Sequence, residues 1–197
     1  MLFHRKRDFK PDRTDKGLLN KLYLTPRQRL TILKWVLYSL LLLLLSLVQD
    51  VLLCKVSILG ATTDLVSCGI LLTALLLQPE QGGIFALVGS IAYYFSGSAP
   101  GPYAIAFLTV LSLLLNIFRH AFLRRSFVSV MLCAGTGMLV YEMLVYVTGL
   151  FLGFTTPARA TVFLVTAGLS ILVMPILYPA ILAVGKIGGE TWKEQLA

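Results

Sequence analysis

The segment from Val36 to Val48 contains no charged residue and includes six consecutive leucines, Leu40–Leu45. With its flanks it reaches the roughly 20 apolar residues that a membrane-spanning helix needs. Several other windows of the chain are as apolar. Only 13% of the residues are charged and 57% are hydrophobic, whereas soluble domains have about 25% charged residues. The sequence therefore predicts an all-α, polytopic membrane protein.

Breaks in the apolar pattern divide the chain into six predicted spanning helices. They cover residues 27–48, 62–77, 84–95, 103–118, 127–151 and 161–184. The third would be only about 18 Å long, less than the roughly 30 Å of hydrocarbon, so neighbouring helices are expected to shield it. Pro175 and Pro179 are expected to kink the sixth. The six helices form one domain, 25–186, between tails 1–24 and 187–197.

Basic residues are concentrated on one side of this predicted topology. Of the 17 Lys and Arg residues, only Lys55 and Arg159 fall on the opposite side. The positive-inside rule then places both termini in the cytoplasm. The apolar spacing over residues 17–24 fits a short helix on the membrane surface or a solvated linker. The net charge of +8 is expected to meet anionic lipid headgroups, not nucleic acid.

Patterns of catalytic or metal-binding residues are missing from the sequence. There are two histidines and three cysteines, and their spacing matches no metal motif. Neither a Gly-x-Ser-x-Gly turn nor an HExxH helix occurs, and Gly82-Gly83 is not followed by the Lys and Ser/Thr of a phosphate loop. No cofactor, no metal and no enzymatic activity are expected. Cys68 and Cys133 are interpreted as small core residues.

Glu142 is the ionisable residue that the apolar pattern makes most conspicuous. It lies about mid-way along the fifth predicted helix, where a charge costs at least roughly 2.5–3.5 kcal/mol. We expect it to face the bundle, beside Tyr141 and close to the hydroxyl of Tyr93. Three interpretations stay open: a glutamate that joins helices, a contact to a partner or a conformational role, and handling of a proton or substrate.

Other candidate residues lie in the connections or at small-residue spacings. Gly82, Ala86 and Ser90 recur every four residues, which indicates close helix packing or a face for a partner helix. Asp50, Lys55 and Asp64 surround the first outer connection, as solvated interfacial charges or partner contacts. Arg119, Arg124 and Arg125 are interpreted as topology anchors, or as contacts with an acidic partner or lipid.

The stretch 93–103, YYFSGSAPGPY, interrupts the apolar pattern with glycine, proline and serine. Gly97, Gly101 and the two prolines favour a tight reversal. We expect an extracytoplasmic hairpin between the third and fourth helices, with Tyr103 at the start of the fourth.

Three stretches together resemble the MreD family of rod shape-determining membrane proteins. In 48–65 they are Gln49, Leu59-Gly60 and Asp64-Leu65; in 81–104, Gly82, Gly89, Ser96-Gly97, Gly101 and Tyr103-Ala104; in 124–142, Arg125, Ser126-Phe127 and Tyr141-Glu142. Two positions depart from the family pattern. Thr63 replaces a favoured proline, and Tyr93 replaces a common aspartate, so no role of that acid is carried over.

The resemblance implies a non-enzymatic scaffold in the inner membrane of a bacterial cell, which supports lateral peptidoglycan synthesis and cell shape. Its expected partners are an MreC-like single-span protein, an MreB-like actin, a SEDS glycosyltransferase and a class B penicillin-binding protein. The MreD fold is similar to the six-helix substrate-binding component of energy-coupling-factor transporters. That similarity leaves an alternative function, the capture of a small vitamin-like molecule.

Overall fold

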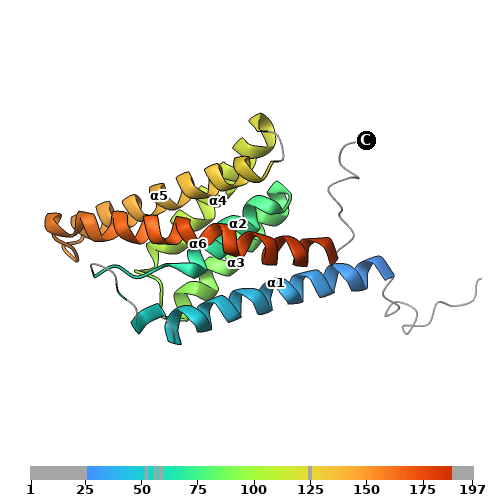
Figure 1. Cartoon of the computed structure of the whole chain (residues 1–197), viewed down its shortest axis with the longest axis horizontal. Coiled ribbons are helices and arrows are strands. Elements are labelled where there is room, and N and C mark those ends of the chain that lie inside the picture. The colour runs from blue at the N-terminus through green and yellow to red at the C-terminus, as the bar shows by residue number, and fades with distance from the viewer. Residues whose placement is uncertain (1–25, 52, 56, 58–59, 124–125, 188–197) are drawn as a thin grey trace, which may run out of the picture.

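The structure is a computed structural model that describes residues 26–51, 53–55, 57, 60–123 and 126–187. Within these residues the regular elements are all helical (Figure 1), which confirms the predicted all-α fold. They are α1 (Pro26–Val51), η2 (Leu53–Lys55), α2 (Leu65–Leu76), α3 (Pro79–Phe95), α4 (Tyr103–Phe122), α5 (Phe127–Phe151), η3 (Pro157–Arg159) and α6 (Ala160–Ile187). The predicted surface helix at 17–24, Arg124, Arg125 and the tail from 188 onward lie outside the described residues.

Four of the described helices are long and apolar enough to cross a membrane. These segments are Arg29–Val51, Tyr103–Phe122, Phe127–Phe151 and Pro157–Ile187. Many of their large apolar side chains face outward, as expected where lipid replaces water. The chain therefore has the composition and helix lengths of a multi-pass membrane protein.

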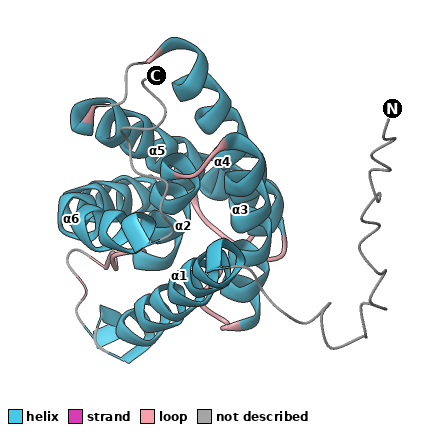
Figure 2. Ribbon diagram, turned by 90° about the vertical axis from the view of Figure 1, so that its right-hand side faces the viewer, coloured by secondary structure: helices cyan, strands magenta, loops and turns pink. Residues whose placement is uncertain are grey.

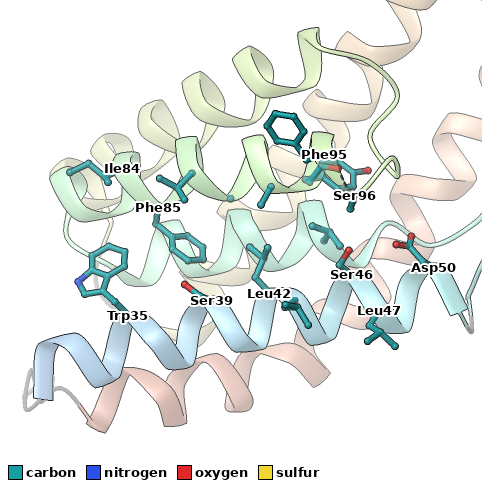
Figure 3. A pocket seen from close by; sticks show the side chains of 16 residues that line it. Trp35, Ser39, Leu42, Ser46, Leu47, Asp50, Ile84, Phe85, Phe95 and Ser96 are labelled. Atoms are coloured by element: carbon teal, nitrogen blue, oxygen red, sulfur yellow. Dashed lines mark hydrogen bonds between the residues drawn. The ribbon is translucent and has the colours of Figure 1, made fainter. Parts of the chain in front are cut away.

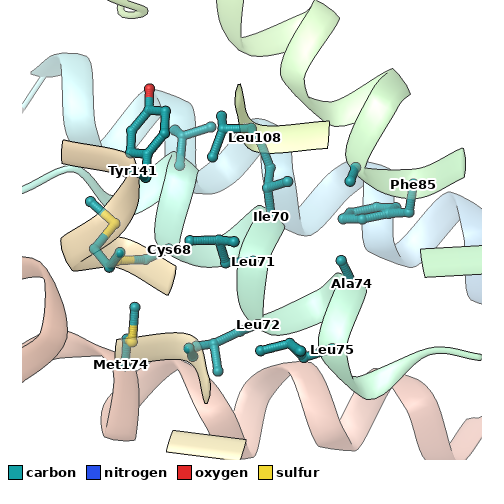
Figure 4. Close-up of a cluster of buried hydrophobic side chains, with 14 of the residues drawn as sticks. Cys68, Ile70, Leu71, Leu72, Ala74, Leu75, Phe85, Leu108, Tyr141 and Met174 are labelled. Carbon is teal, nitrogen blue, oxygen red and sulfur yellow. The ribbon is translucent and has the colours of Figure 1, made fainter. Parts of the chain in front are cut away.

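Helix α2 lies at the centre of the bundle and contacts each of the other five α-helices (Figure 2). Every residue from Leu65 to Leu75 is buried. Figure 4 shows its side chains meeting Phe85 of α3, Leu108 of α4 and Met174 of α6. A helix that is apolar on all sides needs a neighbour on every side. The five surrounding helices provide that environment.

Side chains of other helices hydrogen-bond to both ends of α2. At its start, Val66 N donates to Gln49 Oε1 at 2.9 Å, from the end of α1. Near its end, Asn116 Nδ2 of α4 donates to Ala74 O at 2.6 Å. A helix leaves unpaired N–H groups at its start and unpaired C=O groups at its end. These contacts satisfy some of those groups without water.

The prediction that the third helix is the short one is wrong. Helix α3 has 17 residues, whereas α2 has 12. Helix α3 begins early because Pro79 occupies its first turn, where the missing N–H of proline costs nothing. Gly82, which precedes the predicted start of this helix, lies within it and packs against the backbone of α2 at Ala74. Helix α2 begins late because Asp64 caps it.

The other predicted boundaries agree with the structure to different degrees. Helix α5 has the predicted range, 127–151, and α6 differs by a few residues at each end. Helix α4 continues to Phe122, so Arg119 and His120 lie inside it. Helix α6 continues through Pro175 and Pro179, and the predicted kink there stays a prediction.

Candidate functional site

A polar cavity of about 160 Å³ lies at the end of the bundle where α2 begins and α3 ends. We call it the acidic cavity, because two carboxyl groups line it, from Asp64 and Glu142. Two tyrosines, Tyr93 and Tyr141, line the same space. The remaining walls are polar and apolar side chains of the α1 end, the connections before α2 and α4, α5 and α6: Gln49, Thr62, Thr63, Ser98, Pro100, Val145, Val162, Phe163 and Thr166.

Asp64 is the most highly connected residue of the acidic cavity. One carboxylate oxygen accepts from Ser67 N at 3.2 Å, and the other accepts from the Tyr93 hydroxyl at 2.8 Å. Its own backbone N donates to Ser170 Oγ of α6 at 2.9 Å. Aspartate is among the preferred helix N-caps because its short carboxylate reaches the first free amides. Asp64 therefore joins α2, α3 and α6 at one point.

The interpretation of Asp64 as a solvated interfacial charge is wrong, since only 8% of the residue is exposed. Glu142 is accordingly one of two buried carboxyl groups among the residues that the structure describes. The expectation for the first connection fits Asp50 and Lys55 better, because both are exposed. Asp50 also accepts a hydrogen bond from Ser98 Oγ, which links the end of α1 to the connection between α3 and α4.

Glu142 projects from α5 and is 6% exposed. It makes no hydrogen bond with another described residue, and it lines the same cavity as Asp64. The hydroxyl of Tyr141, a residue 1% exposed, is also buried and has no hydrogen-bond partner among the described residues. Buried polar groups are usually paired. Two unpaired groups at one cavity are therefore an unusual feature of this site.

Tyr93 occupies a different place in the network from the one expected. It shares the acidic cavity with Glu142, but its hydroxyl donates to Asp64. The hydroxyl was expected close to Glu142, and its hydrogen-bond partner is instead Asp64, the other buried carboxyl group among the described residues. The contact spans 29 positions of sequence, so no local pattern indicated it.

A larger, mostly apolar groove lies between α1 and α3 (Figure 3). Its volume is about 890 Å³, and Figure 3 shows its length from Trp35 and Ile84 at one end to Asp50 and Ser96 at the other. We call it the α1–α3 groove. Tyr93 lines both the groove and the acidic cavity. The two spaces therefore share one wall.

The candidate glycines Gly82, Gly97 and Gly101 have structural roles: they allow close contact between helices or tight turns of the backbone. A Cβ on Gly82 would collide with Ala74 O and Asn116 Nδ2, so α2 and α3 can approach only with glycine there. Gly97 has a φ of 79°, in the region that glycine favours, and terminates α3. Gly101 packs against the ring of Tyr103, whose hydroxyl donates to Pro100 O at 3.2 Å. The predicted reversal thus lies at residues 96–102.

Arg119 was predicted to anchor the topology at the membrane surface, but it is buried. Its Nη2 lies 3.1 Å from His120 Nε2, and it shares a face of α4 with the buried Asn116 and Ser112. Positions 112, 116 and 119 follow helical spacing, which is a signal that sequence reasoning could have used. Arg124 and Arg125 lie outside the described residues, so their predicted role stays a prediction.

Metal-binding residues do not cluster in the part of the chain that the structure describes, where no three His, Cys, Asp or Glu side chains come together as a site. Cys68 and Cys133 are buried, free thiols, as their interpretation as core residues requires.

Comparison with known proteins yields no match: no family model, no curated protein and no solved structure matches this chain. Its function therefore has to be inferred from the groove and the cavity themselves.

Proposed function

We propose that the chain is a non-enzymatic scaffold of the bacterial inner membrane, of the MreD kind, that binds the single transmembrane helix of an MreC-like partner. The observation that carries this proposal is the α1–α3 groove. It is about 890 Å³ in volume, it is lined mainly by apolar side chains, and it lies beside a helix whose leucines are largely exposed.

The dimensions and side chains of the α1–α3 groove suit a helix. From Trp35 to Asp50 the α1 wall is about 22 Å long, enough for a large part of a spanning segment. Its walls include the small residues Ser39, Ser46 and Ala92. Because lipid gives helices no hydrophobic reason to associate, close contact at small residues is what drives such pairing.

The arrangement in the membrane follows from charge and shielding. We propose six crossings, in which α2 and α3 cross as inner helices covered by α1, α4, α5 and α6. Both termini would be cytoplasmic, because that places only Lys55 and Arg159 of the 17 basic residues outside. The acidic cavity would then open on the extracytoplasmic side. The bound partner would connect the chain to an MreB-like actin, a SEDS glycosyltransferase and a class B penicillin-binding protein.

The experiment fills the groove while leaving the bundle intact. Ala92→Trp places an indole in the α1–α3 groove, where Ala92 is exposed. Ala106→Trp makes the same change on an exposed position of α4 and is the matched control. We expect Ala92→Trp to abolish co-purification of the MreC-like protein and to widen cells, while Ala106→Trp does neither. Retention of the partner by Ala92→Trp would refute this assignment of the groove.

The acidic cavity favours a second candidate function, the substrate-capture subunit of an energy-coupling-factor transporter. Capture needs several polar groups that converge in a pocket, and Asp64, Glu142, Tyr93 and Tyr141 do converge. The volume of about 160 Å³ is small beside the roughly 300–1,000 Å³ of ordinary ligand sites. Co-purification of an ATPase pair with a membrane coupling subunit, instead of an MreC-like protein, would favour this function.

A further inference from the structure

The acidic cavity is lined by acidic side chains and by no basic one among the residues that the structure describes. Its lining has two carboxyl groups, and no Lys, Arg or His is among the lining residues that the structure describes. Lys55 and Arg159, the basic residues predicted for this side of the membrane, are exposed and are not part of the lining. A carboxylate removed from water is costly unless a cation or hydrogen-bond donors accompany it.

Hydrogen bonds among the described residues satisfy only one of the two carboxyl groups. Asp64 accepts from Ser67 N and from the Tyr93 hydroxyl. Glu142 accepts no hydrogen bond from a described residue, although it is more than nine-tenths buried. The unpaired hydroxyl of Tyr141, the preceding residue, borders the same space. The polar groups that lack hydrogen bonds to described residues are therefore those of Glu142 and Tyr141, whose oxygen atoms line the same cavity.

Several oxygen acceptors around one small cavity suit a ligand group that has several N–H donors and a positive charge. A primary ammonium has three donors, and a guanidinium has a planar fork of donors. The Glu142 carboxylate, the free lone pairs of Asp64 and the Tyr141 oxygen would accept from such a group. A volume of about 160 Å³ admits a head group of this size but not a whole vitamin.

We propose that the acidic cavity binds the head group of a small organic cation, a primary ammonium or a guanidinium, with Glu142 as its main counter-ion. This inference does not rest on the scaffold function, since it involves the cavity and not the α1–α3 groove. Under the capture function it would identify the substrate class.

The test uses the full chain in lipid nanodiscs and two probes, ethylammonium chloride and methylguanidinium chloride. Tetramethylammonium chloride, which has no N–H donor, replaces the probe so that ionic strength stays constant, and sodium chloride forms a separate arm. We expect at least one probe to raise the Tm, by about 3–5 °C for each tenfold concentration above half-saturation. The two control salts should leave the Tm unchanged.

Three variants test whether the probes raise the Tm by binding in the acidic cavity. Glu142→Gln keeps the shape of the side chain and removes its charge, so it should abolish the response to the probes. Tyr141→Phe removes one acceptor oxygen and should raise the half-saturating concentration about 2- to 10-fold, a readout that remains if Glu142→Gln does not fold. Glu80→Gln, an exposed acid at the other end of the bundle, should respond like the unmodified chain.

Three results would overturn the assignment. One is the absence of a saturable response to both probes. Another is an equal response to sodium or tetramethylammonium, which would indicate general ionic or metal binding. The third is a normal response in a folded Glu142→Gln protein, which would place the cation elsewhere.

Discussion

Helices α1 and α2 are built from similar residues but have opposite surroundings. Helix α1 has 26 residues, and leucines such as Leu40 and Leu43 are more than half exposed. Helix α2 has 12 residues, and Ile70, Leu71 and Leu72 are fully buried. Helix α1, about 39 Å long, can cross a membrane with lipid around it. Helix α2, at about 18 Å, is shorter than the roughly 30 Å of hydrocarbon and cannot face lipid alone, so it depends on the protein helices that cover it.

The two helices also differ in what hydrogen-bonds to the backbone groups at their ends, because they differ in length. The first amides and last carbonyls of α2 meet Gln49, Asp64 and Asn116 inside the bundle. A long helix such as α1 reaches the polar interface, where water serves these groups. A short central helix thus requires buried polar residues around its ends. This requirement explains why the acidic cavity lies at the start of α2.

The largest expected effect is the loss of a buried leucine from α2. Leu71→Ala removes a side chain that is completely enclosed, and it should lower the free energy of unfolding by about 2–5 kcal/mol. Unfolding of the purified protein in mixed micelles, followed by circular dichroism, measures the change. A loss below about 1 kcal/mol would show that the environment of α2 is not close-packed.

A somewhat smaller loss of stability is expected from a substitution at the contact between α3 and α2. Gly82→Val would force a side chain against Ala74 O, and overpacking of this kind costs about 1–3 kcal/mol. Gly168→Val on α6 is the control, since nothing lies within 4 Å of its added Cβ. Equal unfolding midpoints for the two variants would contradict the close approach of α2 and α3.

The hydrogen bond between Tyr93 and Asp64, at the start of α2, should contribute less to the free energy of unfolding than the packing of α2 does. Tyr93→Phe removes the hydroxyl that donates to Asp64, and hydrogen bonds within membrane bundles contribute about 0.6–1.7 kcal/mol. The same unfolding assay measures the loss. Tyr94→Phe, at a more exposed tyrosine next in sequence, should change stability less; the reverse order would remove Tyr93 from the network.

The sequence predicted the helices well but not their neighbours. Hydropathy located all six helices and the full range of α5, because apolar length is a local property. It did not show that α2 is the central helix, since a helix facing lipid and a helix facing protein are equally apolar. The burial of Asp64 and its contact with Tyr93 depend on residues far apart in the chain. Candidate residues were found by type, whereas their partners required the fold.

The smallest expected effect is on the outer face of α1. Leu44 is 55% exposed, and lipid is as apolar as the leucine it contacts. Leu44→Ala should therefore change the free energy of unfolding by no more than about 0.5 kcal/mol, although the substitution is the same as at Leu71. Comparing Leu44→Ala with Leu71→Ala measures how much the surroundings of a leucine determine its contribution to stability, since the residue type is the same in both. A loss at Leu44 close to that at Leu71 would mean that protein covers this face of α1, and the contrast between the two helices would fail.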